Sequence, residues 1–389
     1  MKLIMKKKIL AFGITVLFAL MFPACVSMTD ARDSEPKPFN DISALELVSR
    51  IRIGWNLGNT LDTSDLHWLD RNASVSQFET AWGNPVTTKT HITSVKNAGF
   101  NTIRIPVSWA KCADRNYNIR KDWMRRVKQV VDFAVENDMI IILNTHHDES
   151  IFKFYDKDRE ESKKALTRIW EQIAEVFKGY DEKLIFEGMN EPRTKGSAAE
   201  WNGGTAEERE NVNILNQVFV DTVRASGGNN EKRILMIPTY AASATHQAMS
   251  ALKIPADSAK NKIIVSIHAY EPYNFALNEK SPVNTWNAAN EGDTLPVTER
   301  LDRAYDLFIS KGTPVLMGEF AALNKNNEDA RAEWAQFYVS YAKSKGVKCV
   351  WWDDGGENNP PAGMGLFARR ANHFAYPKIL DALMKASEP

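Results

Sequence analysis

The amino-acid sequence of 389 residues predicts an α/β fold, a single domain in which eight parallel strands close into a (β/α)8 barrel. Short apolar or β-branched runs alternate with amphipathic stretches of helical period along the chain. Eight such runs can be counted, and the length from residue 40 to residue 389 suits one barrel with insertions. An open doubly wound sheet is the alternative, but no glycine-rich phosphate loop opens any expected helix.

The expected strands are short and mostly apolar. In chain order they cover residues 52–56, 102–105, 140–144, 184–187, 234–237, 263–268, 314–318 and 349–352. Parallel neighbours need a crossover, usually a helix, and helices are expected at 121–137, 162–178, 207–226, 298–311, 328–345 and 376–386. The first of these places Val127, Val130, Val131 and Ala134 on one face, which is the pattern of a helix packed on a sheet.

The N-terminal segment is typical of an export signal. Lysines in the first eight residues precede an apolar run from Ile9 to Phe22, which is too short to span a bilayer as a stable helix. Residues 1–25 are therefore expected to be a signal peptide, residues 26–39 a flexible tether, and residues 40–389 the catalytic domain. A lipidated Cys25 and an ordinary signal peptide with an incidental cysteine both remain open. In either case the protein is expected to be exported, and a lipid on Cys25 would be its one link to a membrane.

The overall composition excludes some classes of partner. Lys and Arg together number 49, as do Asp and Glu, so the formal net charge is zero and nothing indicates nucleic-acid binding. The hydrophobic fraction of 43% and the charged fraction of 25% are those of a globular protein. Cys112 and Cys349 are expected to stay unpaired. The sequence is silent on oligomeric state, and a monomer is expected.

Polar and aromatic side chains gather at the ends of the expected strands. In a parallel barrel all carboxyl-terminal strand ends meet at one mouth, so residues far apart in the sequence converge there. The side chains placed in this way are Asn56, Arg104, His146, Asn190, Glu191, His268, Tyr270, Glu319 and Trp352.

Two carboxylates in this set, Glu191 and Glu319, directly follow or end apolar runs. One reading is structural, with each Glu in an ion pair, for instance with Arg104. The other is glycoside cleavage, in which one carboxyl group protonates the leaving oxygen and the second attacks or stabilises the anomeric carbon. A separation of roughly 5–5.5 Å between the carboxyl groups would give retention of configuration.

Eight short motifs in the same order resemble one known family. They are GWNLGNTLD (54–62), WGNP (82–85), GFNTIRIPVSW (99–109), NTHHD (144–148), FEGMNEP (186–192), HAY (268–270), GEF (318–320) and WWDDG (351–355). The series resembles the endoglucanases (cellulases) of glycoside hydrolase family 5, in particular the subgroup that acts on cellulose, xyloglucan and mixed-linkage glucan. The resemblance implies a TIM barrel and a secreted, endo-acting, retaining β-1,4-glucanase that hydrolyses cellulose-type β-glucans by double displacement without a cofactor.

The resemblance also implies roles for individual residues. Glu191 would be the general acid/base, with a pKa raised by burial and by the neighbouring carboxylate, and Glu319 would be the nucleophile, kept anionic by Arg104. Asn190 would hydrogen-bond the 2-hydroxyl of the sugar. The remaining polar ring would comprise His146, His268 near the acid/base and Tyr270 bonded to the nucleophile. Trp352 would be the platform beneath the sugar, and strand alternation should turn Trp351 into the packing.

Further residues have two readings. His147 is expected to line a substrate subsite, although adjacent histidines beside Asp148 could in principle hold a metal; no metal is expected. Trp201 and Trp286 lie in polar stretches after strands and are expected to stack on sugar. Asn56 could contact sugar or order the first loop.

Rival functions stay open beside the leading one. The nearest keeps the chemistry and changes the substrate to xyloglucan, mixed-linkage glucan, xylan or mannan. A non-catalytic sugar-binding barrel and a metal-dependent amidohydrolase are more remote.

Overall fold

The structure, a computed structural model, describes residues 38–356 and 363–388. The expected signal peptide, the lipidation site at Cys25 and nearly all of the expected tether lie outside the described residues. The described residues form one compact unit.

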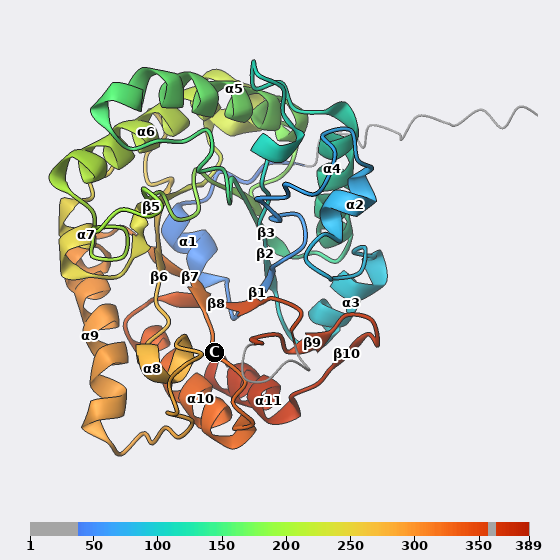
Figure 1. Ribbon diagram of the computed structural model, residues 1–389. Helices are drawn as coiled ribbons and strands as arrows, with labels where there is room; N and C mark the ends of the chain where they lie inside the picture. Colours follow the sequence, from blue (N-terminus) through green and yellow to red (C-terminus); the bar gives the residue numbers. More distant parts are fainter. Residues whose placement is uncertain (1–37, 357–362, 389) are drawn as a thin grey trace, which may run out of the picture. The chain divides into compact units, whose positions relative to one another are not determined.

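Eight parallel strands form a closed barrel in sequential order, with β1 paired to both β2 and β8 (Figure 1). The strands are β1 (Gly54–Leu57), β2 (Thr102–Ile105), β3 (Ile140–Asn144), β4 (Leu184–Glu187), β5 (Leu235–Ser243), β6 (Ile263–His268), β7 (Val315–Phe320) and β8 (Lys348–Asp353). The predicted (β/α)8 fold is confirmed, and β2, β3, β4 and β6 have the predicted bounds.

Four strands reach further toward the carboxyl end than predicted, β1 by a single residue, to Leu57. β5 continues through Pro238 to Ser243, β7 to Phe320 and β8 to Asp353, with register shifts in the pairings of β5 with β6, β6 with β7 and β7 with β8. Glu319 therefore lies inside a strand, which fixes its backbone on both sides.

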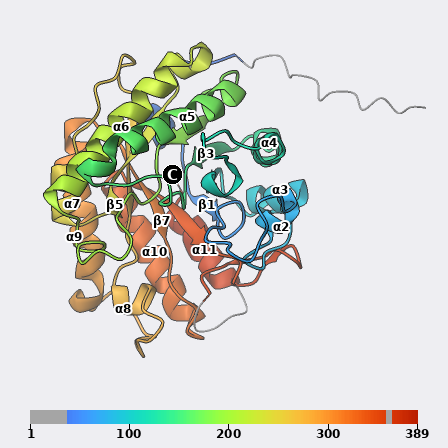
Figure 2. The same ribbon diagram turned by 45° about the horizontal axis from the view of Figure 1, so that its top comes forward.

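Helices pack around the barrel, and the first of them covers its amino-terminal end. They are α1 (Ala44–Ser49), α2 (Val75–Glu79), α3 (Lys89–Asn97), α4 (Lys121–Glu136), α5 (Arg159–Phe177), α6 (Ala206–Ala225), α7 (His246–Ala251), α8 (Tyr273–Ala276), α9 (Glu291–Leu307), α10 (Glu328–Ser344) and α11 (Pro377–Ala386). α5 and α6 lie side by side, as do α10 and α11 (Figures 1 and 2). A short hairpin of β9 (Phe367–Ala368) and β10 (His373–Phe374) precedes α11.

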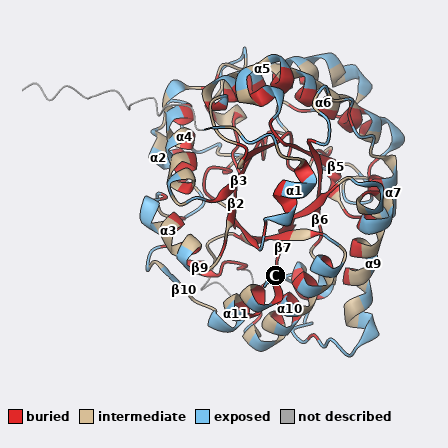
Figure 3. Cartoon of the chain, turned by 180° about the vertical axis from the view of Figure 1, so that it is seen from behind, coloured by how far each residue is buried: buried red, intermediate tan, exposed pale blue. Residues whose placement is uncertain are grey.

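Capping residues set where the helices begin, and the spacing of apolar residues sets which face of each helix is buried. The side chains of Thr88 and Thr205 accept backbone hydrogen bonds at the starts of α3 and α6 in capping boxes. Buried residues colour the inner faces of the helices, and exposed ones the outer faces (Figure 3). Burial of these apolar faces against the barrel is what holds the ring of helices in place.

The amino-terminal end of the barrel is closed. Ala44, Leu47 and Val48 of α1 are buried against strand residues that include Ile142, Ile185 and Met236. Figure 3 shows α1 within the ring of strands when the molecule is seen from behind. A ligand can therefore reach the barrel only at its carboxyl end, where the predicted polar residues lie.

Cys112 and Cys349 are buried free thiols, as predicted. Among the helices of the described residues, none combines the length and apolar character needed to span a membrane.

Candidate active site

The two predicted carboxylates face each other across one histidine. Nδ1 of His268 lies 3.0 Å from Oε1 of Glu191 and 3.6 Å from Oε2 of Glu319. One oxygen of each Glu and one nitrogen of His268 all lie within 4.8 Å of one another. Two carboxyl groups that lie 128 positions apart in the chain thus come together at the barrel mouth. His268 lies beside Glu191, as predicted.

Arg104, at the end of β2, organises the polar ring. Its Nη1 donates to Oε1 of Glu319 over 2.8 Å, and its Nη2 donates to Oδ1 of Asn190 over 2.6 Å. Its Nε donates to Oε2 of Glu187 over 2.7 Å. Burial opposes a charged guanidinium, but Glu187 and Glu319 raise its pKa, so Arg104 remains a fixed cation.

Glu187 is a functional residue that the sequence reasoning missed. Its side chain is fully buried, and besides Arg104 it accepts hydrogen bonds from Ser266 over 2.8 Å and from Asn144 over 3.0 Å. A buried carboxylate with three donors costs far less than an unpaired one. The signal that could have found it was a Glu in the apolar run LIFE.

Tyr270 completes the hydrogen bonding of Glu319. Its hydroxyl donates to Oε2 over 2.7 Å, the contact that was predicted. Burial and the nearby charge of Glu319 raise the pKa of this phenol well above its ordinary value, so it stays a donor. Gly318 makes room for the ring of His268, since a Cβ there would lie 3.0 Å from its Nε2.

Trp352 and His146 form an aromatic floor. Their rings stack with centroids 5.6 Å apart and an angle of 3° between planes. A side chain on Gly58 would approach the Trp352 ring to 2.8 Å, so this glycine permits the placement. Burial, with the charges of His147 and Arg104, holds the pKa of His146 well below its ordinary value, and His146 is neutral. Trp351 is fully buried, as predicted.

A second charged group flanks Glu191. Arg193 lies 3.6 Å from Oε2 of Glu191 and donates to Glu149 and Glu200, each over 3.0 Å. Nδ1 of His147 lies 3.6 Å from Glu149, and the His147 ring lies 5.8 Å from that of Trp82. Arg193, Glu149 and Trp82 were not predicted as site residues.

The expected pKa rise for Glu191 is not found in the substrate-free protein. Burial pushes its pKa up, but the hydrogen bond with His268 and the charges of His268, Arg193 and His147 together lower it. The prediction was wrong here because it considered burial and the neighbouring carboxylate but not the charges of His268, of His147 and of Arg193, which lies two residues along the chain.

Two predicted substrate contacts are contradicted by burial. Trp286 is 4% exposed, packs on Phe337 at 5.2 Å and donates to the carbonyl of Asp293, so it has no free face for a sugar. Asn56 is fully buried, donates to the carbonyls of Gly318, Val350 and Trp351, and accepts from Arg104. Its role is to position Arg104.

Trp201 remains available to a ligand. Its ring is 59% exposed, and the guanidinium of Arg193 lies 4.5 Å from the ring centroid. A cation on one face of the indole leaves the other face to solvent.

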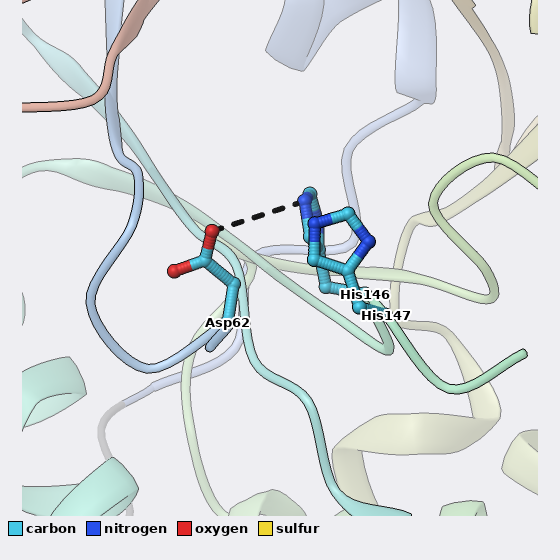
Figure 4. Close-up of side chains that lie close together, drawn as sticks. All are labelled: Asp62, His146 and His147. Carbon is cyan, nitrogen blue, oxygen red and sulfur yellow. Dashed lines mark ion pairs between the residues drawn. The ribbon is translucent and has the colours of Figure 1, made fainter. Parts of the chain in front are cut away.

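Two groups of side chains could in principle hold a metal. Asp62, His146 and His147 form one, and Figure 4 shows the carboxylate of Asp62 facing the two rings. In this group Asp62 Oδ2 and His146 Nε2 are 4.0 Å apart, wider than the roughly 3.4 Å between ligands of a tetrahedral zinc. Both Asp62 oxygens also accept backbone hydrogen bonds, from Asn59 and Thr60. In the second group, Glu191, His268 and Glu319, both oxygens of Glu319 already accept hydrogen bonds, from Arg104 and Tyr270. That no metal is used stays a prediction.

The site has two facing carboxyl groups above an aromatic floor, in the mouth of a parallel barrel. Glycoside hydrolases use this arrangement to cleave sugar chains. The family model described as "Cellulase (glycosyl hydrolase family 5)" matches residues 68–358, more than half of the chain. The chain belongs to glycosyl hydrolase family 5, and the resemblance seen in its motifs is confirmed.

Relatives agree with this assignment. Endoglucanase A from Clostridium longisporum is 46% identical over 88% of this chain and 66% of its own length, so the chain spans just under two thirds of that protein. Endoglucanase A from Ruminococcus albus is 42% identical over 89% of this chain and 93% of its own.

Solved structures show the same barrel. A GH5-4 broad specificity endoglucanase from Ruminococcus champanellensis, with bound cellotriose, has a TM-score of 0.86 at 44% identity, covering 89% of this chain and 99% of that one. A glycoside hydrolase 5 lichenase from Caldicellulosiruptor sp. F32, with cellotetraose, has a TM-score of 0.84 at 43% identity, covering 91% of this chain and 97% of that one.

Proposed function

We propose that the protein is an endo-acting β-1,4-glucanase that hydrolyses cellulose-type β-glucans with retention of configuration. The observation that carries the proposal is the pairing of Glu191 and Glu319, whose oxygens lie within 4.8 Å of each other. A gap of this size suits a carboxylate that attacks the sugar directly, because an attacking water would need a wider one. The endoglucanase relatives support the choice of a β-glucan.

In the first step, an oxygen of Glu319 attacks the anomeric carbon while Glu191 gives its proton to the leaving oxygen. The glycosidic C–O bond breaks, and a glycosyl ester on Glu319 forms. Arg104 and Tyr270 hold the two oxygens of Glu319 in place for this attack. Because both oxygens are already held, the carboxylate loses less conformational entropy when it reaches the transition state.

In the second step, Glu191 removes a proton from water, which attacks the anomeric carbon and releases Glu319. One water is consumed and the original configuration is restored. The proton taken from water leaves Glu191 in its acid form for the next cycle. Bound sugar would exclude water from Glu191 and strengthen the desolvation that already opposes its ionisation.

Asn190 is proposed to bind the 2-hydroxyl of the sugar. Arg104 occupies its Oδ1, which leaves the amide Nδ2 as donor to the substrate. Trp352 would form the platform below the sugar, with His146 behind it. His147 and Trp201 are proposed as contacts in neighbouring subsites.

Mixed-linkage glucan is the second candidate substrate, because a lichenase is among the similar structures. Xyloglucan, xylan and mannan use the same chemistry and are distinguished by assay. We also propose that residues 1–25 direct export, with Cys25 either lipidated or removed; fractionation of expressing cells into medium, envelope and cytoplasm tests this.

The test of the mechanism is Glu319→Ala in a reducing-sugar assay on carboxymethylcellulose, xyloglucan, lichenan and mannan. We expect turnover to fall by about three orders of magnitude or more while the protein stays folded. Azide added to Glu319→Gly should yield a glycosyl azide of inverted anomeric configuration. Glu171→Ala, at a half-exposed residue paired with Arg168, is the control. Unchanged turnover in Glu319→Ala would remove Glu319 from the mechanism.

A chelator separates this proposal from a metal-dependent hydrolase. Because both chemical steps use side chains alone, EDTA should leave the activity of the wild-type protein unchanged. Loss of activity with EDTA and its return with added zinc would instead point to the group of Asp62, His146 and His147.

A further inference from the structure

A pocket of about 640 Å³ opens beside the catalytic residues. Its walls come from the loops that follow β1, β2, β3 and β4, mainly residues 64–71, 147–158 and 193–195. Two of its lining residues, His147 and Arg193, belong to the charged group around Glu191. The pocket therefore begins one side chain away from the carboxyl group that we assign as acid/base.

The pocket carries an excess of positive charge. Six basic residues line it against three acidic ones, Asp65, Glu149 and Asp158. Lys195 pairs with Asp65 at 3.4 Å and with Glu149 at 3.3 Å, and Arg193 pairs with Glu149 at 3.0 Å. The other four, Arg71, Lys111, Lys153 and Lys157, form no ion pair with a carboxylate of the described residues. Since the chain as a whole has no net charge, this excess is local.

The inner wall of the pocket is apolar. Phe78, Phe152 and Phe154 are buried beneath it, and Leu66, Leu69 and Tyr155 are partly exposed at its surface. Aromatic and aliphatic walls pack against the C–H faces of a sugar ring, and a basic rim binds a carboxylate. The two features together suit a sugar that carries an acid group.

The basic side chains are held at the rim. Nζ of Lys153 donates to the carbonyl of Glu149, and Nζ of Lys157 lies 5.8 Å from the centre of the Tyr155 ring. Nζ of Lys111 donates to oxygens of Leu61 and Thr63, so it contributes its charge without a direct contact. An excess of one sign of charge between low-dielectric walls concentrates its field on the ligand.

We infer that this pocket binds a carboxylate-bearing substituent of the polysaccharide, such as an acidic sugar branch, while the main chain occupies the cleft between Glu191 and Glu319. The inference rests on the proposed function, which it extends from the main chain to its decoration. A neutral branch would pack against the apolar wall of the pocket but would leave the four basic side chains without a counter-charge.

The experiment compares an anionic and a neutral glucan of the same backbone, carboxymethylcellulose and hydroxyethylcellulose. The ratio of kcat/KM on the first to that on the second is measured for the wild-type protein, for Lys153→Gln/Lys157→Gln and for the control Lys163→Gln/Lys164→Gln. The control pair lies on α5, outside the pocket, and removes the same charge. The ratio should fall about threefold or more in the pocket variant and stay near wild type in the control.

Salt gives a second readout. The wild-type ratio should decline between low salt and about 0.5 M salt, because ions screen charges at an open pocket. An unchanged ratio in the pocket variant, or an equal fall in the control, would overturn the inference and leave the proposed function intact.

Binding is measured separately from hydrolysis by mobility in native gels that contain either glucan. The carboxymethylcellulose gel should retard the wild-type protein more than the pocket variant, and the hydroxyethylcellulose gel should retard both equally. This result supports the inference even if no glucan is hydrolysed. In that case only the proposed function fails.

Discussion

Arg104 lies between two carboxylates, and only one of them is proposed to react. Glu319 faces the sugar site, whereas Glu187 lies deeper in the barrel with Ser266 and Asn144. A cation shared by two anions is held in a single orientation, and its effect on either anion depends on the other. Glu187 is therefore a positioning residue that sets how strongly Arg104 stabilises the charge of Glu319.

Glu187→Gln tests this role. The substitution keeps the shape of the side chain but removes a negative charge, so more of the positive charge of Arg104 acts on Glu319. The anion of Glu319 is then more stable and, for the same reason, a weaker nucleophile. We expect the acid limb of the kcat/KM profile to move about half a pH unit or more to lower pH, and kcat to fall about tenfold. Ser266→Ala removes one hydrogen bond without charge and should leave the acid limb in place. A loss of activity with an unmoved profile would mean that Glu187 serves packing alone.

At the scale of elements, two tryptophans with similar sequence surroundings have opposite environments. Trp201 lies in the loop between β4 and α6 with more than half of its surface exposed, and Trp286 lies between α8 and α9 against α10. The polar neighbours of Trp286 suggested exposure, but α9 begins already at Glu291, earlier than predicted, and its first turn covers the ring edge through Asp293.

Substitution of the two residues should separate binding from stability. Trp201→Ala is expected to raise KM for a polymeric glucan several-fold with an unchanged melting temperature, since an exposed ring stacks on ligand but packs on little protein. Trp286→Ala should lower the free energy of unfolding by about 3–5 kcal/mol with no selective change in KM. Steady-state kinetics and denaturant unfolding check both variants. The reverse pattern would contradict these assignments.

At the scale of the whole molecule, a buried acid couples stability to pH. Asp148 accepts hydrogen bonds from the backbone amides of Trp109 and Ala110, each over 2.8 Å, and so ties together the loops after β2 and β3. Burial raises its pKa to about 7, although these two bonds act in the opposite direction. Between its unfolded pKa near 3.8 and its folded value, the folded state holds the extra proton, so this residue costs stability as pH rises.

Asp148→Asn should remove that dependence, because the amide keeps the oxygen that accepts both bonds and does not ionise. The melting temperature of the variant relative to wild type should increase between about pH 5 and about pH 8, in line with about 1.4 kcal/mol for each unit of pKa difference. Thermal unfolding at a series of pH values measures this. Parallel curves for the two proteins would show that Asp148 ionises alike in both states.

The sequence by itself determined the order of strands and helices and the identity of the facing residues. The hydrophobic periods of strands and helices are local patterns, so apolar runs such as 140–144 and 184–187 are enough to predict these strands. The rule that parallel strand ends share one mouth then brings Glu191, Glu319, Arg104 and Tyr270 together without knowledge of any distance.

Only the tertiary structure decided what each of these residues has around it. The sequence marks Glu187 as a carboxylate in an apolar run but does not show that Arg104 is its partner. Trp286 and Asn56 look accessible in the sequence, and other segments of the fold cover them. The lowered pKa of Glu191 depends largely on His268, which lies 77 positions away in the chain, at the end of β6. Burial and charge proximity are properties of segments distant in the chain, and no local pattern encodes them.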